Sequence, residues 1–141
     1  WRHFKPELDT FFAGLAPPQA SASNIMRGLM MDDAGVLWIA VIQEWTGGET
    51  PGVLKVDTAV EPHVFEYFGP PTFDDFIVHA AGISIDVEGF VWLVDTLGNQ
   101  AFKFDPDDPS DYVRVEGLVA PYTYSDMTGF GLKRVSDPGP G

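Results

Sequence analysis

Five residues of this 141-residue sequence combine a side chain that can contact a ligand with a position near the start of an expected strand or in a glycine-rich loop. Arg27 supplies a permanent positive charge, and His79 supplies an imidazole that can exchange a proton near neutral pH. Tyr122 and Tyr124 supply aromatic rings that carry a hydroxyl group, and Trp45 lies close to a pair of glycines, where an indole can stack on a sugar or contact a partner. These five residues are the candidate binding residues, and their chemistry suits a small molecule, a glycan or a peptide.

Each candidate also has a structural interpretation that needs no ligand. His79 can cap the start of a strand, and the two tyrosines can pack between sheets. Oxygen ligands for a divalent cation are available on Asn24, Glu44, Asp95 and Asn99. No spacing marks these four residues as a metal site, and Asp95 and Asn99 fall in "DTLGNQ", which is typical of a hairpin loop. We therefore expect turn chemistry at these positions and no bound metal.

Three aspartate doublets raise the same question of metal binding. They lack the D-x-[DN]-x-[DN]-G pattern of a calcium-binding loop, which favours solvated loops. The sequence also contains no Ser-His-Asp arrangement, no phosphate-binding P-loop and no dinucleotide fingerprint, so we expect no cofactor. The doublets are Asp32-Asp33, Asp74-Asp75 and Asp107-Asp108.

The charge balance excludes several classes of partner. Acidic residues outnumber basic ones by 21 to 8, and the net charge is -13. Nucleic acids and anionic membrane surfaces both attract clustered lysine and arginine, so neither is expected as a partner. No apolar run approaches the ~18 residues that a membrane-spanning helix requires, so we expect no membrane insertion. The chain has no cysteine, which excludes disulfides and thiol chemistry but leaves the compartment open.

A repeated hairpin must position the candidate residues. The stretch "GLMMDDAGVLWIAV" at residues 28–41 recurs as "GISIDVEGFVWLVD" at residues 82–95, an offset of 54. A degenerate third copy keeps an aspartate and a glycine at Asp126 and Gly129, 40 residues further on. In D-x-x-G the aspartate side chain accepts backbone N–H groups ahead of it, and the glycine closes the turn in the left-handed conformation. The β-branched and aromatic flanks predict strands.

A second repeated element follows each hairpin. Lys55 and Asp57 in the first copy correspond to Lys103 and Asp105 in the second, and each copy reads as two further short strands. Four antiparallel strands in about 40–50 residues are typical of a β-propeller blade. We therefore predict an all-β fold with about three blades in a single domain spanning 1–141. The expected full blades are 25–69 and 79–117, and the third blade is split between its halves 1–16 and 120–135.

The blade interpretation also assigns the tryptophans and leaves little room for helices. Trp38 and Trp92 occupy the same position in the middle of the second strand of each unit, so we expect both to pack in the core between blades. Helical turns are expected only within 5–10 or 72–78, if anywhere. The polar residues that precede the first strand of each unit, Arg27 and His79 among them, are then expected at the mouth of a central channel.

The motif G-φ-x-φ-D-x-x-G-φ-φ-W-φ, where φ is apolar, resembles that of the NHL-type and streptogramin-lyase-like propellers of bacteria. The resemblance covers most of residues 25–135 and favours a secreted or periplasmic location. It implies, as an alternative function, a metal-dependent lyase or a lactonase-like hydrolase with its site at the channel mouth. The histidine that would then precede the first strand is absent, because the matching positions hold Arg27, Ala81 and Pro121. We therefore favour a non-catalytic binding or scaffold module.

The number of blades carries an expectation about assembly. Propellers of this kind close a ring of six or seven blades, and about three blades cannot close one. Two copies of the chain related by a two-fold axis would supply six, and the split third blade would be completed by the partner. We therefore expect a homodimer. The alternative is that the sequence is a piece of a longer propeller.

Overall fold

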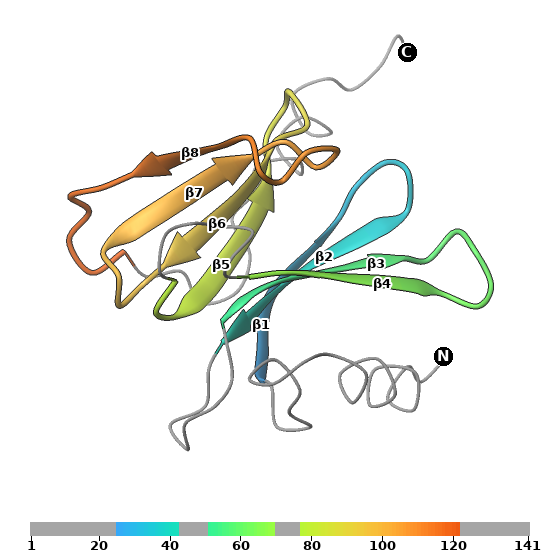
Figure 1. The fold of residues 1–141 in the computed structure, drawn as a ribbon, viewed down its shortest axis with the longest axis horizontal. Helices are drawn as coiled ribbons and strands as arrows, with labels where there is room; N and C mark the ends of the chain where they lie inside the picture. Colours follow the sequence, from blue (N-terminus) through green and yellow to red (C-terminus); the bar gives the residue numbers. More distant parts are fainter. Residues whose placement is uncertain (1–24, 43–50, 70–76, 122–141) are drawn as a thin grey trace, which may run out of the picture.

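The computed structural model describes residues 25–42, 51–69 and 77–121. Within these ranges the chain is all-β, with two four-stranded antiparallel sheets and no helix (Figure 1). None of the described residues forms a helix of the length and apolarity needed to cross a bilayer. The first sheet consists of β1 (Ile25–Met31), β2 (Val36–Ile42), β3 (Gly52–Asp57) and β4 (Val64–Phe68). The second consists of β5 (Ala80–Ile85), β6 (Val91–Asp95), β7 (Gln100–Phe104) and β8 (Tyr112–Val115).

Both sheets have the strand order of a propeller blade. Each strand pairs with the next one along the chain, so the order is β1-β2-β3-β4 in one sheet and β5-β6-β7-β8 in the other. The predicted all-β class and the four-stranded blades are confirmed. The sheets fall within the expected ranges 25–69 and 79–117. The half-blades expected at 1–16 and 120–135 lie outside the described residues, except for residues 120 and 121.

The sequence repeat is also a repeat of backbone geometry. In the first sheet Met26 pairs with Val41 and the register then shifts at a bulge. In the second sheet Ala80 pairs with Asp95 and the register shifts directly afterwards. These pairs are related by the offset of 54 residues that the sequence predicts, so the two blades share a bulge near the start of their first strand.

The two D-x-x-G turns form as the sequence predicts. One carboxylate oxygen of Asp32 accepts the backbone N–H groups two and four residues further on, both at 2.9 Å. Asp86 accepts the corresponding groups at 2.9 and 3.1 Å. Gly35 and Gly89 have φ angles of +85° and +94°, a region where a residue without a Cβ meets no steric cost. The turns therefore require both residue types.

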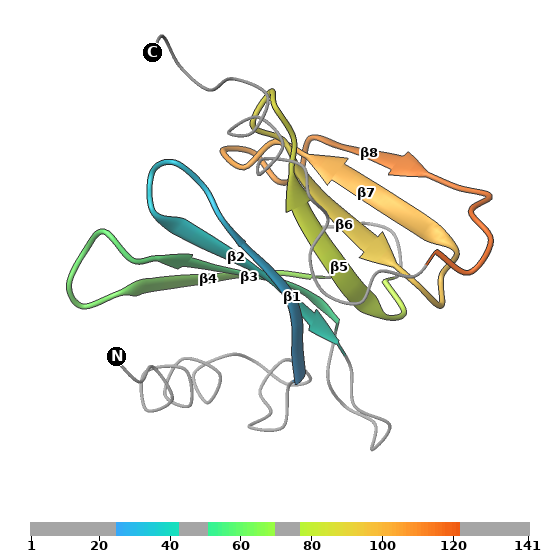
Figure 2. The ribbon, with the colours of Figure 1, turned by 180° about the vertical axis from the view of Figure 1, so that it is seen from behind.

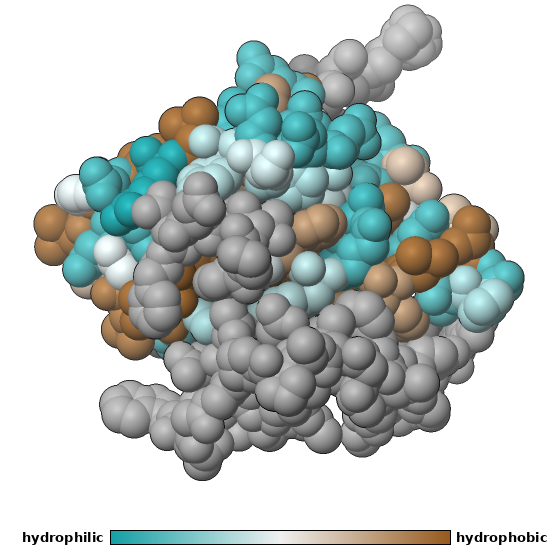
Figure 3. Space-filling view, in the orientation of Figure 1, coloured by the Kyte–Doolittle hydropathy of each residue, from teal (hydrophilic) through white to brown (hydrophobic). Residues whose placement is uncertain are grey.

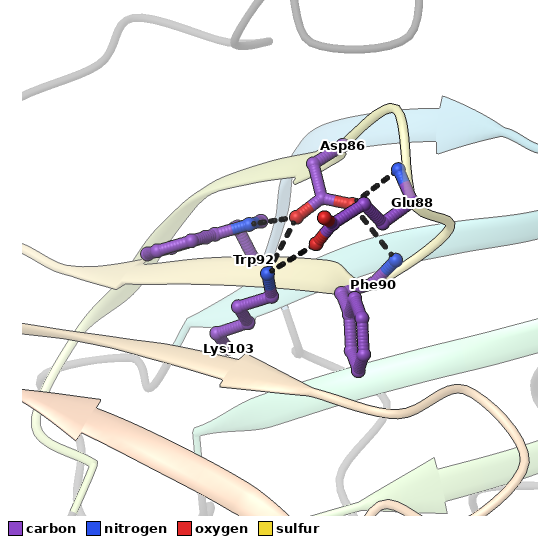
Figure 4. A network of polar contacts seen from close by, with 5 residues as sticks. All are labelled: Asp86, Glu88, Phe90, Trp92 and Lys103. Carbon is purple, nitrogen blue, oxygen red and sulfur yellow. Dashed lines mark hydrogen bonds and ion pairs between the residues drawn. The ribbon is translucent and has the colours of Figure 1, made fainter.

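A tryptophan braces each turn, which the sequence analysis missed. In the second blade the indole of Trp92 donates to Asp86 at 2.9 Å, and Lys103 Nζ lies 3.0 Å from the same carboxylate (Figure 4). Lys103 also lies 3.3 Å from Glu88 and 4.2 Å from the ring centre of Phe90. Burial raises the pKa of the Asp86 carboxyl, but the hydrogen bonds from Trp92, Lys103 and the turn outweigh it and hold that pKa below its usual value.

The main core lies between the two sheets. Strands β1 and β2 lie against β5, and Figure 2 shows the same neighbours from behind. Trp38 is 1% exposed and meets Phe104 of the second sheet edge-on, with ring centres 6.0 Å apart. The expected position of Trp38 in the core between blades is confirmed. Val91 and Leu93, which flank Trp92 in β6, point into this core. Strand alternation therefore places Trp92 on the far face of its sheet, where it is half-buried.

The outer edges of the sheets are partly apolar. On the face seen in Figure 3, hydrophilic residues cover much of the described surface, and hydrophobic ones gather toward the two sides of the view. Val64 in β4 and Val113 in β8 are 51% and 61% exposed. Glu66 and Arg114 in the same strands place charges along these edges, which discourages unwanted strand pairing.

Candidate functional site

Two residues interrupt the repeat where the first strand of the second blade begins. The offset of 54 aligns His79 with Ile25 and Asp95 with Val41, so the first blade has apolar residues at both positions. Asp95 is nevertheless completely buried. A buried carboxylate costs free energy unless hydrogen bonds compensate for lost water. Because the first blade forms without this polar pair, the blade fold itself does not require it.

The Asp95 carboxylate is held by four N–H donors. Its Oδ1 accepts from the backbone of His79 at 2.8 Å and of Gly98 at 3.0 Å. Its Oδ2 accepts from the backbone of Val78 at 2.9 Å and from Gln100 Nε2 at 2.8 Å. The carboxylate therefore ties the segment leading into β5 to the hairpin between β6 and β7. This contact fixes the position of the His79 backbone.

The hairpin "DTLGNQ" is built around this carboxylate. A Cβ on Gly98 would overlap the Asp95 side chain and would lie 2.7 Å from Gln100 Nε2. Asn99 takes a φ of +54°, and its side-chain oxygen accepts the backbone N–H of Ala120 at 2.8 Å. The predicted turn role of Asp95 and Asn99 is confirmed. The sequence analysis missed the reach of Asp95 to His79, although an aspartate at a position aligned with Val41 was a usable signal.

The His79 side chain is fixed at its backbone and unpartnered at its ring. Its carbonyl accepts the N–H of Thr96 at 3.1 Å. Its Nε2 is buried without a hydrogen-bond partner, and the same holds for the Thr96 hydroxyl. Burial lowers the pKa of the imidazole, the charge of Asp95 raises it, and the charge of Arg27 lowers it, with a net decrease from the usual value.

Arg27 is exposed in β1, and its charge acts on His79. The described part of the chain contains four lysine and arginine residues. Lys55, Lys103 and Arg114 lie 2.9, 3.0 and 2.7 Å from a carboxylate oxygen. Arg27 has no such partner among the residues that the structure describes. We name Arg27, His79, Asp95 and Thr96 the His79 cluster. The cluster supplies one guanidinium without a carboxylate partner among the described residues and one half-buried imidazole on a braced backbone.

The other sequence candidates cannot be placed beside this cluster. Trp45, Tyr122 and Tyr124 lie outside the described residues, as do Asn24 and Glu44. Both oxygens of Asp95 are occupied by N–H donors. Within residues 25–42, 51–69 and 77–121 no three acidic or histidine side chains converge as metal ligands would. The divalent cation that the enzymatic alternative implies therefore has no ligand set among the described residues.

The two sheets, their strand order and their shared braced turn define an all-β fold of propeller-blade type. No protein family matches the sequence, and no curated protein matches it either. Among solved structures, a catalytically inactive variant of virginiamycin B lyase from Staphylococcus aureus with quinupristin is 15% identical, with a TM-score of 0.35 and 74% of this chain covered. A selenomethionine-substituted form of that lyase is 14% identical, with a TM-score of 0.34 and 65% covered.

This chain spans 45% and 41% of the two lyase chains. The likeness is to a propeller-like fold at low identity, and the assignment of the fold rests on the two sheets themselves.

Proposed function

We propose that the chain is a non-catalytic binding or scaffold module built from propeller blades, with its ligand site where β1 and β5 begin. Arg27 and His79 are the proposed contact residues on the described part of the chain. Tyr122, Tyr124 and Trp45 remain proposed contacts from the sequence. The ligand is a small molecule, a glycan or a peptide.

The bracing of His79 by Asp95 is the observation that carries this proposal. Four hydrogen bonds hold the buried carboxylate of Asp95 at the position that Val41 occupies in the first blade. Sites that bind ligands need side chains whose backbone is already in position, since ordering it on binding would reduce affinity. The imidazole next to this brace makes no hydrogen bond through Nε2. A braced backbone that carries a half-buried imidazole supports a preformed binding site.

The enzymatic alternative is not proposed further. A metal-dependent lyase or hydrolase needs several carboxylate or imidazole ligands, or a general base beside a second catalytic group. In the described residues Asp95 and Arg27 are the charged groups that act on the pKa of His79, and the Asp95 carboxylate already accepts four N–H groups. This set can hold a ligand, but it offers no acid and base pair.

A ligand screen with a matched pair of variants tests the binding proposal. The full chain is screened against small carboxylates, sugars and short peptides by thermal unfolding, where a ligand at ten times its Kd stabilises by about 1.4 kcal/mol. A ligand of the site raises the Tm of the parent chain but not that of His79→Ala. Arg114→Ala is the control, because Arg114 is already paired with Glu116 on the outer strand β8. Ligands that stabilise parent and His79→Ala equally would contradict the proposal.

We also propose that a second copy of the chain completes a six-bladed ring. The far face of the second blade carries Phe90 and Trp92 with Lys103, where the first blade presents Val36 and Trp38 with Lys55 to its neighbour. The equivalent face is thus covered in the first blade and half-exposed in the second. Light scattering tests this: a dimer has twice the 15.5 kDa of the chain, and a stable monomer at micromolar concentration would contradict it.

A further inference from the structure

We propose that copies of the chain associate head to tail, with the free side of the first blade in one copy docked against the far side of the second blade in another. This inference rests on the proposed assembly of copies. It goes beyond that proposal because it names the two surfaces that meet and does not depend on the number of blades in the ring. It follows from repeat positions that are buried between the two described blades but exposed on their free sides.

The contact between the two described blades shows which surfaces fit together. The first blade contributes Trp38, which is 1% exposed and meets the ring of Phe104 with 6.0 Å between ring centres. The second blade contributes Ile83 and Ile85 of β5, which are 0% and 2% exposed, and β5 lies against β1 and β2. Met30 Sδ accepts the Ile85 N–H at 3.2 Å. A tryptophan face on one blade therefore packs against an isoleucine face on the next.

The free side of the first blade repeats the isoleucine face. The offset of 54 aligns Leu29 with Ile83 and Met31 with Ile85. Met30 points toward the second blade, so strand alternation places Leu29 and Met31 on the opposite side of the sheet. They are 56% and 49% exposed, whereas the aligned isoleucines are buried. The Met31 face consists of Leu29, Met31, Leu37 and Phe65, the last two of which are half-buried.

The far side of the second blade repeats the tryptophan face. Trp92 aligns with Trp38 but is only half-buried. Phe90 lies on the same side, with Lys103 Nζ 4.2 Å from its ring centre and 5.5 Å from that of Trp92 (Figure 4). Lys103 pairs across the sheet with Val113 of β8, which is 61% exposed. The Trp92 face consists of Phe90, Trp92 and Val113. The chain therefore presents both halves of the blade contact, one on each free side.

The two faces lie where a second copy can join them. Met31 directly precedes the D-x-x-G turn of the first blade, and Phe90 directly follows that of the second. In the described pair Met30 meets Ile85, so the turn ends of neighbouring blades lie together. A second copy that repeats this contact brings its Met31 over Trp92. The contact is confined to the turn ends, because the other apolar residues of the free sides are already buried; these are Ile39, Leu54, Val94 and Ala101.

The charge of the chain predicts how the contact responds to salt. Each copy carries a net charge of -13, so copies repel one another over long distances. Because both faces are apolar, burial drives the contact. Sodium chloride screens the repulsion, so association in sedimentation velocity should tighten as salt is raised. Association that weakens with salt would indicate ion pairs and would overturn the inference.

Charged substitutions on the two faces test the inference in the same assay on the full chain. Met31→Glu places a carboxylate on the Met31 face, and Val113→Lys places a second ammonium group beside Lys103 on the Trp92 face. A charge buried in an apolar contact loses its hydration, so each variant should weaken association about tenfold or more. Leu97→Glu is the matched control, because Leu97 is 60% exposed in the hairpin between β6 and β7 and belongs to neither face. Urea unfolding checks that each variant is folded.

A mixture of the two variants shows whether the contact is head to tail. The Met31→Glu chain keeps an intact Trp92 face, and the Val113→Lys chain keeps an intact Met31 face. The mixture should therefore associate more tightly than either variant alone, and a mixture that does not would overturn the inference. Loss of association in only one variant would mean that one face binds its own copy and would also overturn it, as would variants that associate like the parent chain. These results would leave the proposed ring intact, whereas a parent chain that stays monomeric would overturn both and leave the ligand-binding proposal standing.

Discussion

Replacement of Asp95 by asparagine tests whether the buried carboxylate braces the second blade. The side chain keeps its size, so the change removes acceptors without creating a cavity. Asparagine retains one oxygen, which can accept two of the four N–H groups that now converge on the carboxylate. The other two donors would then face an amide NH2 group. Each buried donor without an acceptor costs about 1–3 kcal/mol, so we expect a loss of about 3 kcal/mol.

Urea unfolding followed by tryptophan fluorescence measures this loss. With a slope of about 2 kcal/mol per molar, the midpoint should fall by about 1.5 M. Asp105→Asn is the matched control. Asp105 directly follows β7 in a turn, and its side chain accepts the backbone N–H of Asp107 at 2.8 Å. That acceptor survives in asparagine, so the control should change stability by less than about 0.5 kcal/mol.

A comparison of the two variants can also refute the bracing role of Asp95. If Asp95→Asn and Asp105→Asn shift the midpoint by the same small amount, the four hydrogen bonds do not constrain the start of β5. The argument for a braced site would then fail with them. If Asp95→Asn alone is destabilised, its His79 signal should also shift in the NMR spectrum, because the His79 N–H loses or changes its acceptor.

Three further predictions concern the turns, the core and pH. Gly89→Ala should cost about 1–2 kcal/mol, because its φ of +94° suits only a residue without a side chain, and urea unfolding measures the loss. Trp38→Ala should cost about 3–5 kcal/mol in the same assay, and the half-buried Trp92→Ala clearly less; equal losses would contradict the assignment of Trp38 alone to the core between sheets. Because the folded pKa of His79 is lowered, stability should be fully present above pH ~6.5 and decrease as the pH falls toward the folded pKa. His79→Gln should lack this component in unfolding curves between pH 7 and pH 5; a parent and variant with the same pH dependence would disprove it.

The D-x-x-G turn shows which contacts a local sequence pattern predicts and which it does not. The pair Asp86 and Gly89 was assigned from sequence because an aspartate side chain and a glycine with positive φ act within a few residues of one another. The indole bond from Trp92 to Asp86 spans six residues and occurs in both blades. It was missed because it depends on how β6 folds back over the turn, which the pattern of residue types does not encode.

The candidate site shows more clearly which contacts cannot be predicted from the sequence. Arg27 and His79 were both selected from sequence as polar residues near the start of a strand. The effect of the Arg27 charge on the pKa of His79 was not derivable, because it depends on β1 and β5 lying side by side across a sequence separation of about fifty residues. Asp95 was assigned to a turn, and its second role appeared only when its four donors were seen to come from two separate segments.

The sequence by itself determined the repeat, and with it the strands, the hairpin turns and the blade class, because these follow from alternation and turn chemistry within one short segment. Only the tertiary structure decided which residues that align in the repeat are also buried to the same extent. Trp38 is buried because a second sheet covers it, whereas Trp92 faces away from that sheet. Asp95 is buried because the segment before β5 closes over it. Burial depends on what lies opposite a residue, and that is a property of the packed sheets rather than of the segment.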